Sequence, residues 1–260
     1  MIDKILSLNP VVQTLIAALI TWSITSIGAS LVFFFKKINK TIMDLTLGFS
    51  AGVMIAASFF SLINPALSMA NALNLIPWLV VSLGIILGGI LLFIGDKVYD
   101  AYKPGSKRKR CSMLIASITL HNIPEGMAIG VAFGSVLYHL DGASIIAAWT
   151  LALGIGLQNL PEGSAISIPL RREGLSRTKS FILGALSGIV EPIAAVIGCI
   201  LVTKAKILLP FLLSFAAGAM IYVVVEELIP ESQTNKKKDL MALFTLIGFV
   251  VMMILDITLG

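Results

Sequence analysis

Long apolar runs separated by short polar segments cover the whole sequence. A helix that crosses a membrane needs roughly 20 consecutive apolar residues, and runs of about this length recur from end to end. We therefore predict an all-α integral membrane protein in which residues 1–260 form a single transmembrane domain. The eight predicted spans are 11–35, 42–63, 75–95, 112–138, 143–169, 180–202, 208–229 and 239–259.

The basic residues predict how these spans are oriented. Sixteen of the 19 Lys and Arg residues fall in the segments after the first, third, fifth and seventh spans. Cytoplasmic loops carry an excess of Lys and Arg, so both termini are expected to be extracytoplasmic, most simply in the cell (inner) membrane. The basic loop 96–111 contains the longest basic run. It can bind anionic lipid headgroups, but we favour a solvated topology signal there.

Composition agrees with a membrane protein and argues against a nucleic-acid partner. Hydrophobic residues make up 57% of the chain, charged residues 13%, and the mean hydropathy is +0.98. Soluble proteins have about a quarter charged residues. The net charge of +5 is scattered over short loops and does not gather on one face. The lipid bilayer is thus one expected partner, and a homodimer is compatible with this reading.

Three glutamates lie well inside predicted spans: Glu125, Glu162 and Glu191. A carboxylate near the bilayer centre costs about 2.5–3.5 kcal/mol on insertion scales and therefore needs a partner or a function. No Lys or Arg occurs within a neighbouring turn of the sequence to neutralise any of them. A mobile cation is the simplest partner for these carboxylates.

Two of the glutamates belong to matching motifs, HNIPEG at 121–126 and QNLPEG at 158–163. Helical residues three and four apart share a face, and consecutive spans are antiparallel. The motifs can therefore face each other across an inverted pseudo-symmetry, with three spans before this pair and three after it. The motif residues expected around the shared volume are His121, Asn122, Glu125, Gln158, Asn159 and Glu162.

The ligand types indicate which ion is bound. Imidazole with carboxylates suits zinc and other first-row divalent ions, whereas an all-oxygen cage favours calcium or magnesium. No cysteine contributes, so a tight structural zinc site is not expected. We predict Zn²⁺ as the substrate, with Fe²⁺, Mn²⁺ or Cd²⁺ as further candidates, and no organic cofactor.

These motifs, with eight spans and a glutamate in the sixth, resemble the ZIP (zinc- and iron-regulated transporter-like) family, and QNLPEG looks most like its GufA branch. The resemblance implies that spans one, four, five and six move as a unit, and that two metal sites adjoin near mid-membrane. Gln158 stands where a second His is common and Asn159 where an acid can occur. The implied first site uses His121, Glu125, Gln158 and Glu162, and the second uses Asn122, Asn159 and Glu191, with Glu125 and Glu162 bridging.

The sequence therefore predicts a divalent metal transporter, not an enzyme, that moves metal toward the cytoplasm through a mid-membrane site with alternating access. Two alternatives stay open. An intramembrane metal-dependent hydrolase could use a similar site to activate water, although His-Glu-x-x-His is absent. A cation or proton channel could use the same buried carboxylates.

Two outlying groups of polar residues have less certain roles. His139 and Asp141, between the fourth and fifth predicted spans, could capture incoming metal, but an ordinary solvated loop is the favoured interpretation. The acidic residues Glu226, Glu227 and Glu231 at the end of the seventh span could form an exit relay or simple interfacial charge, and the sequence favours neither.

Overall fold

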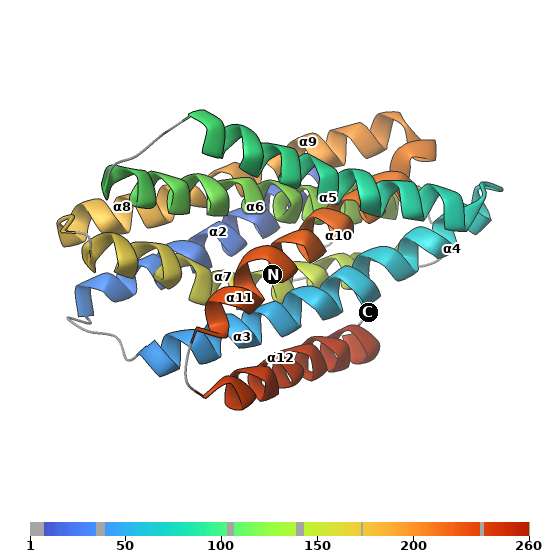
Figure 1. Cartoon of the computed structure of the whole chain (residues 1–260). Coiled ribbons are helices and arrows are strands. Elements are labelled where there is room, and N and C mark those ends of the chain that lie inside the picture. The colour runs from blue at the N-terminus through green and yellow to red at the C-terminus, as the bar shows by residue number, and fades with distance from the viewer. Residues whose placement is uncertain are drawn as a thin grey trace.

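The chain folds into a bundle of long helices that run back and forth along one direction (Figure 1). The computed structural model describes residues 8–34, 40–102, 107–138, 143–172, 174–234 and 237–259, and these contain helices but no strand. The predicted all-α class is confirmed. The α-helices are α2 (Pro10–Phe34), α3 (Lys40–Ala57), α4 (Asn64–Ala72), α5 (Pro77–Tyr102), α6 (Lys107–Ser135), α7 (Ile145–Arg172), α8 (Arg177–Ser187), α9 (Val190–Lys204), α10 (Leu209–Val223), α11 (Ile229–Ser232) and α12 (Lys238–Leu259).

Two π-helical turns join consecutive α-helices. The first, η1 (Ser58–Ile63), connects α3 to α4, and the second, η4 (Val224–Leu228), connects α10 to α11. Each is followed within two residues by a proline, Pro65 or Pro230. Proline clashes with the carbonyl four residues before it, and a wider π turn relieves that clash without ending the helix. Two 3₁₀ turns, η2 (Val136–Tyr138) and η3 (Lys206–Leu208), complete the elements.

Six stretches of the described chain are long and apolar enough to cross a membrane. Residues 107–118, 120 and 121 of α6 have side chains outside the described part of the structure, so these six stretches do not bear on α6. The 28-residue helix α7 is not among them and is more polar on average than α2, α5 or α12. The six stretches are Pro10–Phe34, Lys40–Ala72, Pro77–Gly95, Arg177–Val202, Lys206–Ser232 and Lys238–Thr258.

Two of the predicted spans differ from the observed helices. The span predicted to end at residue 63 continues through η1 and α4 to Ala72, because the π turn accommodates Pro65. The single span predicted over 180–202 is two helices, since α8 ends at Ser187 and α9 begins at Val190. Gly188 caps α8, and its carbonyl accepts a 3.0 Å hydrogen bond from the backbone N–H of Glu191.

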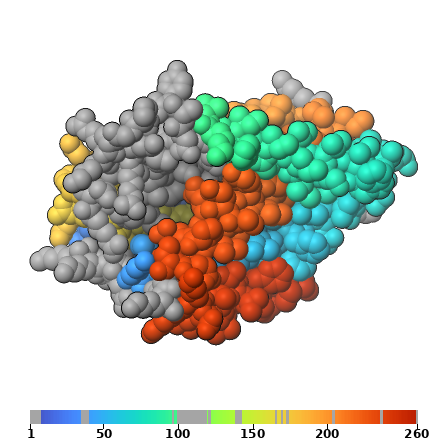
Figure 2. Space-filling model, viewed as in Figure 1, coloured from blue at the N-terminus to red at the C-terminus, as the bar shows by residue number. Residues whose placement is uncertain are grey.

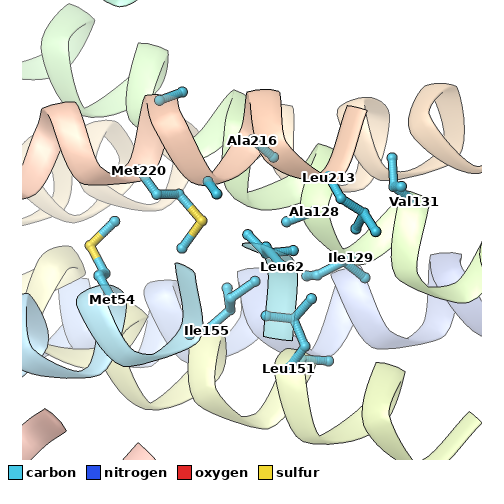
Figure 3. Close-up of a cluster of buried hydrophobic side chains, with 14 of the residues drawn as sticks. Met54, Leu62, Ala128, Ile129, Val131, Leu151, Ile155, Leu213, Ala216 and Met220 are labelled. Atoms are coloured by element: carbon cyan, nitrogen blue, oxygen red, sulfur yellow. The ribbon is translucent and has the colours of Figure 1, made fainter. Parts of the chain in front are cut away.

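The helices pack in pairs around an apolar core. The most extensive contacts join α6 to α9, α2 to α7, α3 to α12 and α5 to α10. Met54, Leu62, Ile129, Leu151 and Met220 are fully buried between α3, η1, α6, α7 and α10 (Figure 3). These side chains form the centre of the main hydrophobic cluster.

The helices α5 and α12 lie at the periphery and present apolar side chains outward. Residues such as Leu83, Ile90, Leu243 and Leu246 are exposed on them. On the face drawn in Figure 2, α10 and α11 (orange) cover the middle of the surface, with α5 (teal) above and α12 (red) below. A helix satisfies its backbone polar groups internally and can therefore be surrounded by lipid. In a membrane, these outward apolar side chains would face the lipid.

Candidate metal centre

The two motifs lie near the middle of α6 and α7. Both helices continue without interruption through Pro124 and Pro161, so residues three and four apart stay on one face. The backbone of His121 belongs to α6, but its side chain lies outside the part of the structure that is described. A ligand role for His121 therefore stays a prediction.

Glu125 on α6 and Gln158 on α7 contact each other directly. The amide Nε2 of Gln158 donates a 2.7 Å hydrogen bond to Oε1 of Glu125, and both side chains are completely buried. Neither Glu125 Oε2 nor Gln158 Oε1 has a hydrogen-bond partner among the described residues. The two motifs therefore meet at this pair, as predicted. One oxygen of Glu125 and one oxygen of Gln158 have no described partner and can still accept.

Asn159 and Glu191 form the second contact within the predicted set. Asn159 Nδ2 lies 3.0 Å from Glu191 Oε1 and 2.9 Å from Oε2. Two hydroxyls from α2 also reach this carboxylate, Thr21 Oγ1 at 2.9 Å from Oε2 and Thr25 Oγ1 at 3.4 Å from Oε1. The sequence analysis missed both threonines. Their signal was a pair of polar residues four apart on one face of an otherwise apolar span.

Asn122 lies against the break between α8 and α9. Its Nδ2 donates a 3.0 Å hydrogen bond to the carbonyl of Ser187, the last residue of α8. The final carbonyls of a helix have no partner within that helix, so the amide satisfies one of them. Asn122 Oδ1 has no partner among the described residues.

Glu162 completes the group of acidic residues. It is 6% exposed, and its carboxylate is close enough to Glu191 and Glu227 for electrostatic repulsion. Glu125 experiences the same repulsion from Glu162 and Glu191. Within the described part of the chain, no three His, Cys, Asp or Glu side chains lie close enough together to hold one ion. The three glutamates share one region, with amide side chains placed between them.

The oxygens without partners fit a cation. Among the described side chains, seven buried polar atoms lack a hydrogen-bond partner, and four of them are oxygens of predicted ligand residues. Buried polar groups are normally paired, so such a concentration needs an explanation. Carboxylate and amide oxygens are hard ligands that divalent cations accept. The four atoms are Asn122 Oδ1, Glu125 Oε2, Gln158 Oε1 and Asn159 Oδ1.

The glycine that ends each motif allows a close helix contact at this centre. A Cβ on Gly126 would collide with the backbone of Glu191 on α9, and one on Gly163 would collide with the backbone of Thr25 on α2. Only glycine permits backbones to approach this closely. The two equivalent motif positions thus bring α9 and α2 to the centre in the same way.

The outlying candidates differ in their relation to the centre. His139 and Asp141 lie outside the described residues. The side chains of Glu226 in η4 and Glu231 in α11 are exposed, whereas Glu227 is half-buried and interacts electrostatically with Glu162. Of the three acidic residues in the predicted relay, Glu227 is the one with an observed connection to the centre.

A cavity of about 350 Å³, lined by both apolar and polar side chains, opens at the end of the bundle where α6 and α12 finish and α7 and α10 begin. The basic helix ends, such as Lys40 and Arg177, lie at the opposite end. Among the described residues that line the cavity, Asp256 is the only acidic one, and it accepts a 3.0 Å hydrogen bond from Ser61 Oγ. Sequence reasoning missed Asp256, because an acid near the end of a span reads as interfacial charge.

Comparisons with known proteins identify the family of this chain. Residues 105–256 match the family described as ZIP Zinc transporter. Zinc transporter ZIP11 from Xenopus tropicalis is 36% identical, covering 97% of this chain and 98% of that protein. Zinc transporter GufA from Myxococcus xanthus is 32% identical over 95% of this chain and 98% of its own length. Zinc transporter ZIPB from Bordetella bronchiseptica is 34% identical over 91% and 78%. The chain therefore belongs to the ZIP zinc transporter family.

Proposed function

We propose that this protein carries Zn²⁺ across the membrane toward the cytoplasm through a site between α6 and α7, exposed to the two sides in turn. The observation that carries the proposal is the meeting of the two motifs at Glu125 and Gln158, with unpartnered oxygens on both side chains. Family membership and relatives named as zinc transporters support zinc as the substrate. Fe²⁺, Mn²⁺ and Cd²⁺ are the competitors to be tested.

The ion-binding position is proposed to use Glu125 and Glu162 with His121 and Gln158. Two carboxylates balance the charge of one divalent ion, and an imidazole nitrogen adds the ligand type that zinc prefers. Mixed ligation without thiolate lets the ion leave again, which a carrier requires. The second position, of Asn122, Asn159 and Glu191, is a prediction from the family resemblance.

The proposed topology has eight spans related as three, two and three. The helix pairs support this topology. An inverted repeat would make α2 equivalent to α9, α3 to α10, α5 to α12 and α6 to α7. With these equivalences, the contact of α6 with α9 corresponds to that of α7 with α2, and the contact of α3 with α12 corresponds to that of α10 with α5. The π turns η1 and η4 also fall at equivalent places in this exchange. Inverted repeats of this kind place substrate sites at the repeat interface, where the motifs lie. Both termini then face away from the cytoplasm.

An apolar layer separates the cavity from the proposed ion position. Ala132 of α6 and Ala148 of α7 line the cavity. Ile129 and Leu151 lie between these residues and the motifs along α6 and α7, and both are fully buried. Figure 3 shows them within the hydrophobic core. Seven helical residues, as from Glu125 to Ala132, span about 10 Å. Zn²⁺ arriving in the cavity therefore needs a rearrangement of this layer, which favours alternating access over a continuous pore.

On the cytoplasmic side, Glu227 supports an exit route. Its electrostatic interaction with Glu162 makes it the next acidic group after the ion position. Positive-inside orientation places η4 toward the cytoplasm. An ion leaving Glu162 in that direction would meet Glu227 before the exposed side chains of Glu226 and Glu231.

Reconstituted transport tests the proposal. Purified protein in liposomes is expected to take up Zn²⁺ with saturable kinetics, and Glu125→Ala is expected to abolish uptake without loss of folded protein. Asp239→Ala, which removes an exposed acid at the start of α12, serves as the matched control and should retain uptake. Unchanged uptake by Glu125→Ala would exclude the proposed ion position. Flux that does not saturate would indicate a channel.

A further inference from the structure

We infer that this chain binds one zinc ion per protomer, at Glu125 and Glu162, and that Asn159, Thr21 and Thr25 hold Glu191 as a positioning residue instead of a metal ligand. This inference rests on the proposed zinc transport and refines its site. It differs from the pair of metal positions that the family resemblance implies.

The carboxylate of Glu191 is already surrounded by three hydrogen-bond donors, Asn159 Nδ2, Thr21 Oγ1 and Thr25 Oγ1. An ionised carboxylate offers about four lone-pair positions on its two oxygens. Asn159 Nδ2 contacts both oxygens, at 3.0 Å and 2.9 Å. Thr21 Oγ1 contacts Oε2 at 2.9 Å, and Thr25 Oγ1 contacts Oε1 at 3.4 Å. Each oxygen therefore has two donors, and the side chain is completely buried.

The threonine hydroxyls have alternative acceptors, but the carboxylate is the stronger one. Thr21 Oγ1 is 3.0 Å from the carbonyl of Ala18, and Thr25 Oγ1 is 3.2 Å from that of Thr21. Hydrogen bonds to an ionised acceptor are roughly twice as strong as neutral ones. Thr21 is also slightly nearer to Glu191 than to its carbonyl, at 2.9 Å against 3.0 Å, and is therefore the main hydroxyl donor to the carboxylate, whereas Thr25 shares its hydroxyl with the carbonyl of Thr21.

Glu125 and Glu162 differ from Glu191 in this respect. Glu125 accepts one described hydrogen bond, from Gln158, and its Oε2 has no partner among the described residues. At Glu162 the acidic neighbours Glu191 and Glu227 repel the carboxylate. A cation approaching the centre therefore gains a free oxygen at Glu125 and relieves repulsion at Glu162, whereas at Glu191 it would displace donors already in place.

Asn159 is the residue that decides this difference. With Nδ2 placed on both oxygens of Glu191, the planar amide directs its Oδ1 away from that carboxylate. Asn159 and Glu191 then cannot share one ion in this geometry. An aspartate at 159 would replace the donor with a second acceptor and repel Glu191, which creates the position that a second divalent ion would neutralise.

The role left to Glu191 is mechanical. It lies in the first turn of α9, beside the break after α8, and its donors come from α2 and α7. Through this carboxylate three elements are tied together next to the ion position. Replacing such an outer partner of a metal site typically lowers metal affinity about 10–100-fold without removing the ion.

The test is the number of Zn²⁺ ions bound by the purified full-length chain, measured by equilibrium dialysis with elemental analysis. We expect one ion per chain for the wild type and for Glu191→Gln, none for the Glu125→Ala and Glu162→Ala double variant, and two for Asn159→Asp. Two ions bound by the wild type, falling to one in Glu191→Gln, would overturn the inference while leaving zinc transport intact.

Wild-type protein and Glu191→Gln decide the question even where Asn159→Asp does not fold. Protein that binds no Zn²⁺ and shows no uptake in liposomes would overturn both the inference and the proposed function. If Asn159→Asp folds and still binds one ion, Asn159 is not the deciding residue and that part of the inference is wrong. The variant Thr21→Ser keeps the hydroxyl donor and should bind one ion, like the wild type.

Discussion

Gln158 Nε2 lies 2.7 Å from Glu125 Oε1, so the two motifs meet through an amide and a carboxylate in the buried centre of the bundle. An ion that takes both oxygens of Glu125 must compete with this hydrogen bond. The amide of Gln158 carries its own acceptor oxygen, which has no partner among the described residues. Gln158 can therefore exchange a donor role toward Glu125 for a ligand role toward an ion.

Replacing Gln158 with histidine should change metal selectivity. Imidazole provides a borderline-soft nitrogen in place of an amide oxygen, and nitrogen ligands favour zinc over harder ions. We expect Gln158→His to bind Zn²⁺ more tightly and to alter the relative uptake of Zn²⁺, Fe²⁺ and Cd²⁺ in competition assays. The control is Gln233→His, at the end of α11. Equal shifts in both variants, or no shift in either, would contradict a ligand role for Gln158.

A methyl group at Gly126 should disrupt the centre. Its Cβ would collide with the backbone of Glu191, which cannot move as a flexible side chain would. We expect Gly126→Ala to lose Zn²⁺ uptake and thermal stability. Gly89→Ala is the matched control, because the nearest atoms to its Cβ lie at 3.9 Å and alanine in a helix gains about 1 kcal/mol over glycine. If both variants keep wild-type uptake, the contact at Gly126 is not critical.

Asp256 should raise the local concentration of metal at the cavity. A carboxylate in a cleft attracts cations, and this effect weakens as ionic strength rises. We expect Asp256→Asn to increase the Zn²⁺ concentration that gives half-maximal uptake, with the maximal rate retained, and to reduce the salt dependence of uptake. Asp239→Asn, outside the cavity, should leave both unchanged. A lower maximal rate without a change in half-saturation would place Asp256 elsewhere in the cycle.

The apolar layer between the cavity and the centre predicts a difference in accessibility. Ile155 is completely buried one turn before the second motif, whereas Ser144 is exposed and lines the cavity. In a chain whose native cysteines are replaced by alanine, Ser144→Cys should react rapidly with a hydrophilic thiol reagent and Ile155→Cys slowly. Equal labelling rates in liposomes would show that the layer does not separate the two positions.

How much of this arrangement could be predicted depends on whether a feature is local in the sequence. The first predicted span, 11–35, nearly coincides with α2, because a continuous apolar run marks its own ends. That the two motifs face each other could be predicted from their duplication, whereas the hydrogen bond that joins them, between Gln158 and Glu125, was not predicted. The break at Gly188 was missed, since a glycine inside an apolar run is equally consistent with an unbroken helix that packs closely.

The donors to Glu191 could not be predicted in the same way. Thr21 and Thr25 lie on α2, roughly 170 residues before Glu191 in the chain, and their pairing depends on how α2 packs against α9. A threonine in an apolar helix can also bond a carbonyl of its own helix, as Thr46 does with Met43. Sequence alone does not distinguish these two uses of the hydroxyl.

That distinction provides the last prediction. Thr21→Val keeps the shape of the side chain but removes a donor from the buried Glu191 carboxylate, and the loss of a hydrogen bond to a charged group costs about 1.5–3 kcal/mol. Thr46→Val removes a hydroxyl that contacts only a carbonyl of its own helix among the described residues. We therefore expect Thr21→Val to lower the midpoint of thermal unfolding in detergent clearly more than Thr46→Val, and Thr21→Ser to restore it. Similar midpoints for the two valine variants would mean that the Thr21 hydroxyl does not stabilise Glu191. The hydrogen bond from Thr21 of α2 would then no longer support the proposed role of Glu191 as a positioning residue.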